Sequence, residues 1–250
     1  MTLQDRITAW IKEYAQRAGM TSLVVGISGG IDSAVVSTLC AMTGLPTYVV
    51  SMPIKQSKAT HNLSLAHAEW ITNKFSNVKH LNIDLTPTFK QFEKLWEEPS
   101  TLGLANSRSR LRMVALYQLA QTAPGGSIVV GTGNKVEDFG VGFYTKYGDG
   151  GVDISPIADC WKTEVWAMGR ELGVLQDIID AVPTDGLWDD GRTDEDQLGG
   201  LSYADLERAM NLDESGDQPA TDQEGLNLYQ YRKIRSRSLH KMNPIPVFKK

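Results

Sequence analysis

The chain carries one short segment in which serines, glycines and an aspartate stand between an apolar run and a helix-like pattern. Residues 23–27 are apolar, and Ser28-Gly29-Gly30-Ile31-Asp32-Ser33 follows directly. Glycines let the backbone approach a ligand closely and allow positive φ. The free N–H groups at the start of a helix, with two serine hydroxyls beside them, favour an anion such as phosphate. Asp32 suits such a site if a Mg²⁺ bridges its carboxylate and the phosphate oxygens.

Two common nucleotide-binding motifs are excluded for this segment. A Walker loop needs Gly-Lys-Ser/Thr after a four-residue gap, and the dinucleotide fingerprint needs Gly-x-Gly-x-x-Gly; neither pattern is present. The segment instead resembles the pyrophosphate loop of ATP pyrophosphatases, which cleave ATP between the α and β phosphates and form an adenylated intermediate. The alternative is an ordinary strand–turn–helix with a glycine-rich turn.

Two later segments also combine glycines with polar side chains. Residues 131–137 (Gly-Thr-Gly-Asn-Lys-Val-Glu) are either a second ligand loop or a helix cap, with Glu137 in the first turn. Residues 146–153, which contain two aspartates, are either a ligand loop or a hairpin turn, since Asp-Gly is common in hairpins. Lys162 stands at a predicted helix start, where the helix dipole disfavours a lysine and a bound phosphate would compensate its charge.

The elements that must position these segments follow from the apolar pattern. Strands are expected at residues 23–27, 47–51, 78–85 and 127–130, with a short fifth at 152–154. Helices are expected at residues 3–18, 33–42, 57–74, 87–96, 106–121, 162–172, 175–181, 202–210 and 222–238. This alternation predicts an α/β fold: a doubly wound, Rossmann-like parallel sheet of about five strands flanked by helices on both faces. The segments after the first and fourth strands then meet at the carboxyl edge of the sheet.

Composition narrows the class of protein. The 250 residues carry a net charge of −5, which argues against a protein whose main role is to grip nucleic acid. No apolar stretch approaches a membrane span, and the first residues lack a signal-peptide pattern. Cys40 and Cys160 read as buried thiols of a reducing compartment. We therefore expect a cytoplasmic protein with no nucleic-acid or membrane partner.

The chain is expected to form a single domain over residues 1–250. Its core spans residues 20–183, and the acidic, glycine-rich residues 184–200 are a probable lid loop. Residues 201–250 supply C-terminal helices and a basic tail. Arg108, Arg110 and Arg112 alternate along a predicted helix, so they face different directions and cannot all serve one purpose.

Taken together, the motifs resemble the ammonia-dependent NAD synthetase family over nearly the whole chain. The marks, in order, are residues 28–33, 110–113, 131–137, 143–151, 183–184, 194–199 and 240–241. The resemblance implies ATP-dependent amidation of deamido-NAD by ammonia, through an adenylated intermediate, to give NAD, AMP and pyrophosphate. It also implies a homodimer, with the dinucleotide site near the dimer interface. Free ammonia, or ammonia from a partner, is then the nitrogen donor.

The resemblance also implies roles for individual residues. The ATP phosphates would be held by Gly26, Ile27, Ser28, Gly29, Gly30, Ile31, Asp32 and Ser33. Further ATP contacts would come from Thr132, Lys162 and Thr184. Mg²⁺ would be bound by Asp32 and Glu137. Deamido-NAD would be contacted by Arg110, Lys146, Asp153, His240 and Lys241. The expected catalytic groups are Lys162, which stabilises phosphoryl charge, and Asp149, which holds and deprotonates ammonium.

The chain departs from the family pattern at two places. Many members carry Gly-Thr-Asp-His where this chain has Gly133-Asn134, and many carry a third basic residue where Met242 stands. Two other functions stay open: another adenylating enzyme, GMP-synthetase-like or tRNA-thiolating, or a non-catalytic nucleotide sensor of the same fold. Thiolation enzymes usually need reactive cysteines, a context that this chain lacks. A sensor would need neither Glu137 nor Lys162.

Overall fold

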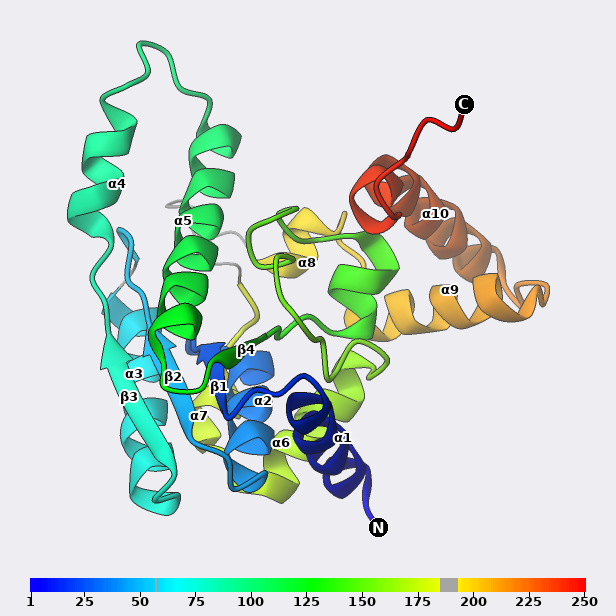
Figure 1. Cartoon of the computed structure of the whole chain (residues 1–250). Coiled ribbons are helices and arrows are strands. Elements are labelled where there is room, and N and C mark those ends of the chain that lie inside the picture. Colours follow the sequence, from blue (N-terminus) through cyan, green and yellow to red (C-terminus); the bar gives the residue numbers. More distant parts are fainter. Residues whose placement is uncertain (57, 185–192) are drawn as a thin grey trace.

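A parallel sheet forms the centre of the molecule (Figure 1). The computed structural model describes residues 1–56, 58–184 and 193–250. In these residues the sheet has four strands, β1 (Ser22–Gly26), β2 (Thr47–Ser51), β3 (Val78–Asn82) and β4 (Ser127–Val130). Their order is β3-β2-β1-β4, and Val25 of β1 is in register with Val49 and Val130. The chain therefore reverses its direction of travel across the sheet between β1 and β4, which is the expected switch point.

Helices surround the sheet much as the apolar pattern predicts. They are α1 (Leu3–Arg17), α2 (Ile31–Met42), α3 (Lys58–Lys74), α4 (Thr86–Glu93), α5 (Thr101–Thr122), α6 (Lys162–Leu172), α7 (Gln176–Ile179), α8 (Asp194–Gln197), α9 (Tyr203–Ser215) and α10 (Asp222–Met242), with the π-helix η1 (Lys135–Val141) after β4. Helix α5 begins five residues earlier than expected, because the Ser100 hydroxyl accepts the Gly103 N–H at 3.0 Å and caps its first turn.

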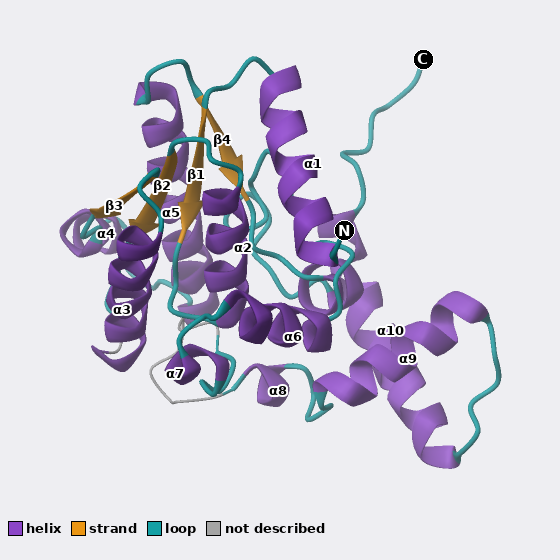
Figure 2. Ribbon diagram, turned by 90° about the horizontal axis from the view of Figure 1, so that it is seen from below, coloured by secondary structure: helices purple, strands orange, loops and turns teal. Residues whose placement is uncertain are grey.

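Both faces of the sheet are buried, as its nearly continuous apolar strands require. Leu23 and Val25 face a cluster built with α1, α2, α3 and α6, whereas Val24 faces α4 and α5. A separate apolar cluster joins η1 to α9 and α10, beside the sheet (Figure 2). Trp166 of α6 contacts both this cluster and the one on the sheet. The C-terminal helices are thereby attached to the core through α6.

The fifth strand expected at residues 152–154 is not formed. Only a single parallel bridge joins Val130 to Ile154. The Asp153 carboxylate accepts the Val129 N–H at 2.8 Å, a donor that a continuing backbone ladder would have used. A side chain therefore replaces the backbone partner and ends the pairing after one bridge.

Two expectations from composition concern the cysteines and the membrane. Cys40 and Cys160 are both free and buried. Burial raises the pKa of the Cys160 thiol to about 11 and also raises that of Cys40, so neither is a reactive thiolate at neutral pH. Throughout the described ranges, no helix combines the length and the apolar character needed to cross a membrane.

The turn after β1 depends on one glycine. Gly29 has φ +95°, a conformation that L side chains rarely adopt. A Cβ there would lie 2.6 Å from the Thr60 carbonyl oxygen and 3.0 Å from the Ser64 nitrogen of α3. Gly30 differs, since its φ is −89° and a Cβ would meet only the Ser28 hydroxyl, at 3.4 Å. A side chain at residue 29 would therefore be strained and would clash with α3, whereas a side chain at residue 30 would meet only the Ser28 hydroxyl.

We predict that Gly29→Ala destabilises the protein and that Gly30→Ala is the matched control. Positive φ costs an alanine about 1–2 kcal/mol, and the clash with α3 adds to this cost. Urea unfolding should show that loss in the free energy of unfolding for Gly29→Ala and a much smaller change for Gly30→Ala. Equal losses in the two variants would show that the turn does not depend on φ at residue 29.

Candidate functional site

A cavity of about 870 Å³ opens at the carboxyl edge of the sheet. It is lined by residues 26–33 after β1, residues 130–133 after β4, the loop 143–151, the N-terminal half of α5 and the end of α10. The expected meeting of the loops after β1 and β4 is therefore confirmed. The cavity is the natural place for a ligand of this fold.

The loop after β1 offers hydrogen-bond donors to an anion. Gly30 is the N-cap of α2, and among the described residues no side chain caps the helix there. The hydroxyls of Ser28 and Ser33 lie 3.2 Å apart, and Ser33 also donates to the Gly30 carbonyl at 2.9 Å. These bonds fix the turn internally. The N–H groups of the first turn and the helix dipole are thereby left directed at the cavity.

An ion cluster lies next to this loop. The Lys162 Nζ donates to Asp32 Oδ2 at 2.6 Å and to Glu137 Oε1 at 2.9 Å. Its side chain is 2% exposed, while those of Asp32 and Glu137 are 18% and 13% exposed. The charge of Lys162 at the start of α6 is thus compensated by two carboxylates, so its burial does not by itself require a bound phosphate. The cluster joins α2, η1 and α6.

Opposite charges set the protonation of this cluster. Burial opposes the charge of Lys162, but Asp32 and then Glu137 outweigh it and raise the pKa of the ammonium. Burial likewise acts to raise the pKa of Glu137, yet Lys162 and the Tyr203 hydroxyl hold it below its usual range. All the donors around Glu137 therefore favour its ionised form.

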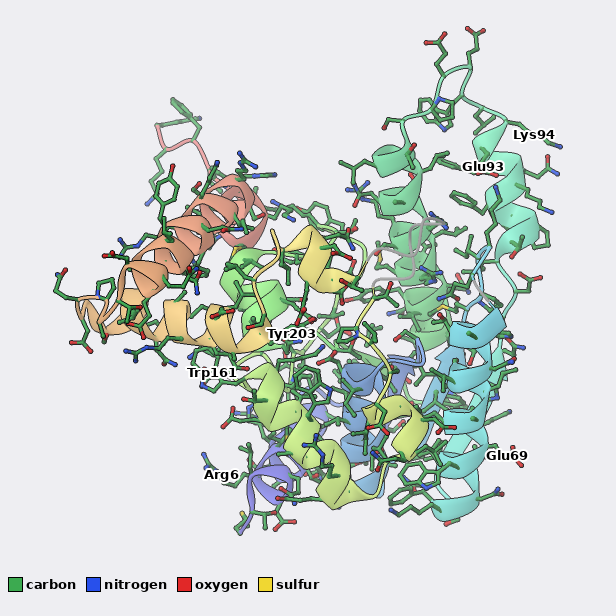
Figure 3. The ribbon with its side chains drawn as sticks, turned by 180° about the vertical axis from the view of Figure 1, so that it is seen from behind. Arg6, Glu69, Glu93, Lys94, Trp161 and Tyr203 are labelled. Atoms are coloured by element: carbon green, nitrogen blue, oxygen red, sulfur yellow. The ribbon has the colours of Figure 1, made fainter. Side chains whose placement is uncertain are left out.

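Tyr203 is a site residue that the sequence did not reveal. Its hydroxyl donates to Glu137 Oε1 at 2.5 Å, and its ring stands edge-on to Trp166 with 5.4 Å between centroids. Burial, and then the charge of Glu137, raises the pKa of Tyr203, so the hydroxyl stays protonated. Figure 3 shows Tyr203 at the start of α9, near Trp161 at the start of α6. In the sequence, Tyr203 is one apolar residue in the periodic pattern of a helix. That pattern does not indicate a contact with Glu137.

The segment after β4 proves to be both a helix cap and a lining of the cavity. Asn134 Oδ1 accepts the N–H groups of Val136 and Glu137, each at 3.0 Å, and so caps η1. Thr132 and Gly133 line the cavity. A Cβ at Gly133 would collide with the Asp138 carboxylate, so a larger residue there would require the Asp138 side chain to move. Burial, and then the charges of Asp149, Glu137 and Asp32, raises the pKa of Asp138 well above its usual range.

Basic side chains gather at the other end of the cavity. Arg110 Nε donates to the Lys146 carbonyl at 3.2 Å, and Lys146 Nζ donates to the His240 carbonyl at 3.1 Å. Lys241 donates to the carbonyls of Tyr144, at 2.9 Å, and Gly142. The structure thus brings four of the expected dinucleotide contacts together. Met242, one of the departures from the family pattern, packs beside Gly142.

Asp149 lies on the wall of the cavity. Its Oδ1 accepts the Ser109 hydroxyl at 2.6 Å and the Thr145 N–H at 3.0 Å. The surrounding protein raises the pKa of Asp149, and these two hydrogen bonds oppose the rise. The 146–153 segment is therefore a loop anchored to α5 and not a hairpin of the sheet.

One expected site residue lies outside the cavity. Asp153 is exposed, does not line the cavity, and accepts the Tyr117 hydroxyl at 2.9 Å as well as the Val129 N–H. Thr184 lines the cavity, together with Asp194 and Gln197 of α8. Within the expected lid loop 184–200, residues 185–192 lie outside the described residues.

Comparison with known proteins gives a consistent family. The chain matches the family model described as NAD synthase over residues 3–245. It is 34% identical over 252 residues to an NH(3)-dependent NAD(+) synthetase of Methanosarcina mazei, which covers 98% of this chain and 96% of the relative. It is 42% identical over 204 residues to the corresponding protein of Alkaliphilus metalliredigens, covering 78% of this chain and 80% of the relative.

A solved structure of similar fold is that of NMN synthetase from Francisella tularensis. The two share 30% identical residues and a TM-score of 0.85 over 98% of this chain and 96% of that one. The resemblance inferred from the motifs is thus confirmed over almost the full sequence. The chain belongs to the NAD synthase family, whose members are ligases that form a carbon–nitrogen bond.

Proposed function

We propose that the chain catalyses the ATP-dependent amidation of deamido-NAD with ammonia, through an adenylated intermediate, to give NAD, AMP and pyrophosphate. The observation that carries this proposal is the cavity, in which Asp32, Lys162 and Glu137 lie beside the start of α2 while His240 and Lys241 line the other end. The first end suits a metal-bound triphosphate and the second suits an anionic dinucleotide. Membership of the NAD synthase family supports the same reaction.

In the first step the nicotinate carboxylate attacks the α-phosphorus of ATP. A carboxylate oxygen bonds to that phosphorus, the bond from phosphorus to the bridging oxygen of the β-phosphate breaks, and pyrophosphate leaves. Residues 26–33 hold the departing phosphates through backbone N–H groups and serine hydroxyls. Lys162 stabilises charge on the phosphoryl oxygens, and Thr132 and Thr184 contact the nucleotide. The protein supplies alignment and charge neutralisation.

The donor set at Asp32 and Glu137 fits Mg²⁺. This ion prefers oxygen ligands and is commonly bound by one or two carboxylates together with substrate phosphates and water. Across the described residues, no group of three or more His, Cys, Asp or Glu could hold a metal by itself, so phosphate oxygens would complete the coordination. Bound there, Mg²⁺ supplies charge neutralisation for the phosphates. Lys162 is then free to pair with the phosphates as well as with the carboxylates.

In the second step ammonia attacks the carbonyl carbon of the acyl-adenylate. A carbon–nitrogen bond forms, the bond from that carbon to the AMP oxygen breaks, and AMP leaves. Ammonium must first lose a proton, for which Asp149 is the proposed acceptor. Among the described residues, the Ser109 hydroxyl and the Thr145 N–H both donate to Oδ1, so Oδ2 is the oxygen offered to a ligand in the cavity. Its raised pKa favours proton acceptance.

Contacts to deamido-NAD are assigned to Arg110, Lys146, His240 and Lys241. The positive charges of the arginine and the two lysines attract its phosphates. Asp153 lies outside the cavity of its own chain, so its contact would have to be made with substrate bound to a second copy. We therefore extend the proposal to a homodimer. Sedimentation velocity distinguishes one copy from two.

A second candidate substrate is nicotinate mononucleotide. The similar solved structure from Francisella tularensis is that of an NMN synthetase, and this match to an enzyme named for a mononucleotide favours the second substrate. Amidation of this acid is the same chemistry on a substrate that lacks the adenylate half. The end of the cavity that holds ATP would serve the reaction with either substrate. Only the basic end would distinguish the two substrates.

One assay tests the reaction and chooses between the two acids. The protein is incubated with ATP, Mg²⁺, ammonium chloride and either deamido-NAD or nicotinate mononucleotide. From deamido-NAD we expect NAD, AMP and pyrophosphate in equal amounts. We also expect kcat/KM to be higher for deamido-NAD than for nicotinate mononucleotide. A higher kcat/KM for the mononucleotide would replace the substrate while keeping the reaction. Formation of ADP, or no requirement for ATP, would contradict the proposal altogether.

Lys162→Ala should impair adenylation. Removing this charge is expected to slow pyrophosphate exchange about 10²–10³-fold, as for the loss of one strong electrostatic contact in an active site. Lys135→Ala is the matched control, because Lys135 also contacts two carboxylates, of Asp159 and Glu214, but lies outside the cavity. Near-normal exchange by Lys162→Ala would remove this residue from the adenylation site.

Asp149→Asn should separate the two steps. The amide preserves the shape of the side chain and can still accept from Ser109, but it cannot take a proton from ammonium. Pyrophosphate exchange should therefore stay near the rate of the unmodified protein, whereas formation of NAD slows. Loss of exchange in this variant would show that Asp149 acts earlier, in binding or adenylation.

A further inference from the structure

Asn134 stands at the junction of the two loops that meet at the switch point, and it is fully buried. Its Nδ2 donates to Asp32 Oδ1 at 3.1 Å and to Glu137 Oε2 at 2.8 Å. With the two N–H groups that it caps, the side chain makes four hydrogen bonds, which is its full capacity of two donors and two acceptor positions. The amide of Asn134 thus binds the carboxylate of Asp32, which lies 102 positions earlier in the chain.

From this geometry we propose that Asn134 is a positioning residue, whose amide holds the carboxylates of Asp32 and Glu137 at the separation needed to bind ATP-associated Mg²⁺. The inference rests on the proposed function, which assigns the ion to these two side chains. It also gives a role to a departure from the family pattern, since many members carry a histidine at this place.

The oxygens of the two carboxylates are divided between Asn134 and Lys162. Asn134 binds Asp32 Oδ1 and Glu137 Oε2, whereas Lys162 binds Asp32 Oδ2 and Glu137 Oε1. Glu137 Oε1 also accepts the Tyr203 hydroxyl. A ligand phosphate that draws Lys162 away therefore leaves the Asn134 and Tyr203 bonds intact. The contacts vacated by Lys162, at Asp32 Oδ2 and Glu137 Oε1, become available to a cation, while the carboxylates keep their spacing.

The orientation of the amide is not free. Two backbone N–H groups fix Oδ1 on one side, so Nδ2 must point to the carboxylates. An aspartate would keep the cap but turn two donated bonds into contacts between like charges. A serine would also cap the helix, yet it is too short to bridge both carboxylates. Of the capping side chains, an asparagine supplies both functions at once.

The test compares Asn134→Ser with Asn77→Ser. The amide of Asn77 also donates twice, to the carbonyls of Ala41 and Leu45, and lies away from the cavity, so this variant matches the lost hydrogen bonds. Mn²⁺ serves as the probe for the ion and α,β-methylene-ATP, which cannot be cleaved between its first two phosphates, as the nucleotide. Electron paramagnetic resonance of free Mn²⁺ gives the dissociation constant, and urea unfolding gives stability.

We expect Asn134→Ser, which keeps the cap without adding charge, to weaken Mn²⁺ binding about tenfold or more, the scale of one lost charge-assisted hydrogen bond, while Asn77→Ser binds like the unmodified protein. Both variants should lose stability. If Asn134→Ser loses stability but binds Mn²⁺ as the unmodified protein does, the residue is only a cap and the inference is overturned. Should that variant fail to fold, Asn134→Thr, which also keeps the cap, must show the same selective loss of Mn²⁺ binding.

The unmodified protein separates this inference from the function on which it rests. If it binds no Mn²⁺ with the nucleotide analogue, the proposed ATP and metal site is wrong. If it binds Mn²⁺ but Asn134→Ser and Asn134→Thr do so equally well, only the role of Asn134 is wrong.

Discussion

The buried ammonium of Lys162 is the charge around which this site is built. Transfer of a lysine from water to a position 2% exposed is costly unless opposite charges and hydrogen bonds surround it. Asp32 and Glu137 meet that requirement, and each comes from a different loop at the carboxyl edge of the sheet. Two carboxylates and one ammonium leave the cluster with a net negative charge when all three are ionised. This net negative charge therefore favours the binding of a cation that enters together with an anionic ligand.

The parallel sheet determines which parts of the chain can meet at this cluster. Strands β1 and β4 are neighbours although about a hundred residues separate them, and the loops that follow them open to the same edge. Asp32 lies in the first turn of α2 and Glu137 in that of η1. Helix α6 then presents Lys162 to both. The same topology that buries the apolar strands thus also assembles the polar centre.

The C-terminal third of the chain closes the site from the other side. Helix α9 brings the Tyr203 hydroxyl onto Glu137, and the end of α10 packs its lysine onto carbonyls of the 142–146 loop. These helices share an apolar cluster with η1, so their position is coupled to that of Glu137. The family match extends to residue 245, which includes this layer. Helices α9 and α10 therefore contribute side chains to the site in addition to packing against η1.

Local sequence determined the strands, nearly all the helices and the loop after β1, because apolar periodicity and glycine-rich turns act over a few neighbouring residues. It also identified Asp32, Glu137, Lys162 and the basic residues at the end of α10 as members of one site, through the resemblance to a family. Tertiary structure decided the partners. Lys162 pairs with two carboxylates, which the sequence did not indicate, and the Asp153 carboxylate ends the sheet where a fifth strand was expected.

The helix cap after β4 was one of the sequence-based alternatives, but the sequence did not indicate the bond of Asn134 to Asp32 or the contact of Tyr203 with Glu137. Each joins groups that lie far apart along the chain, 102 and 66 residues respectively. Propensity and spacing describe which hydrogen bonds a residue can make with its neighbours. Which distant donor meets which acceptor depends on how the layers pack, and a buried polar group takes the partner that the packing brings to it.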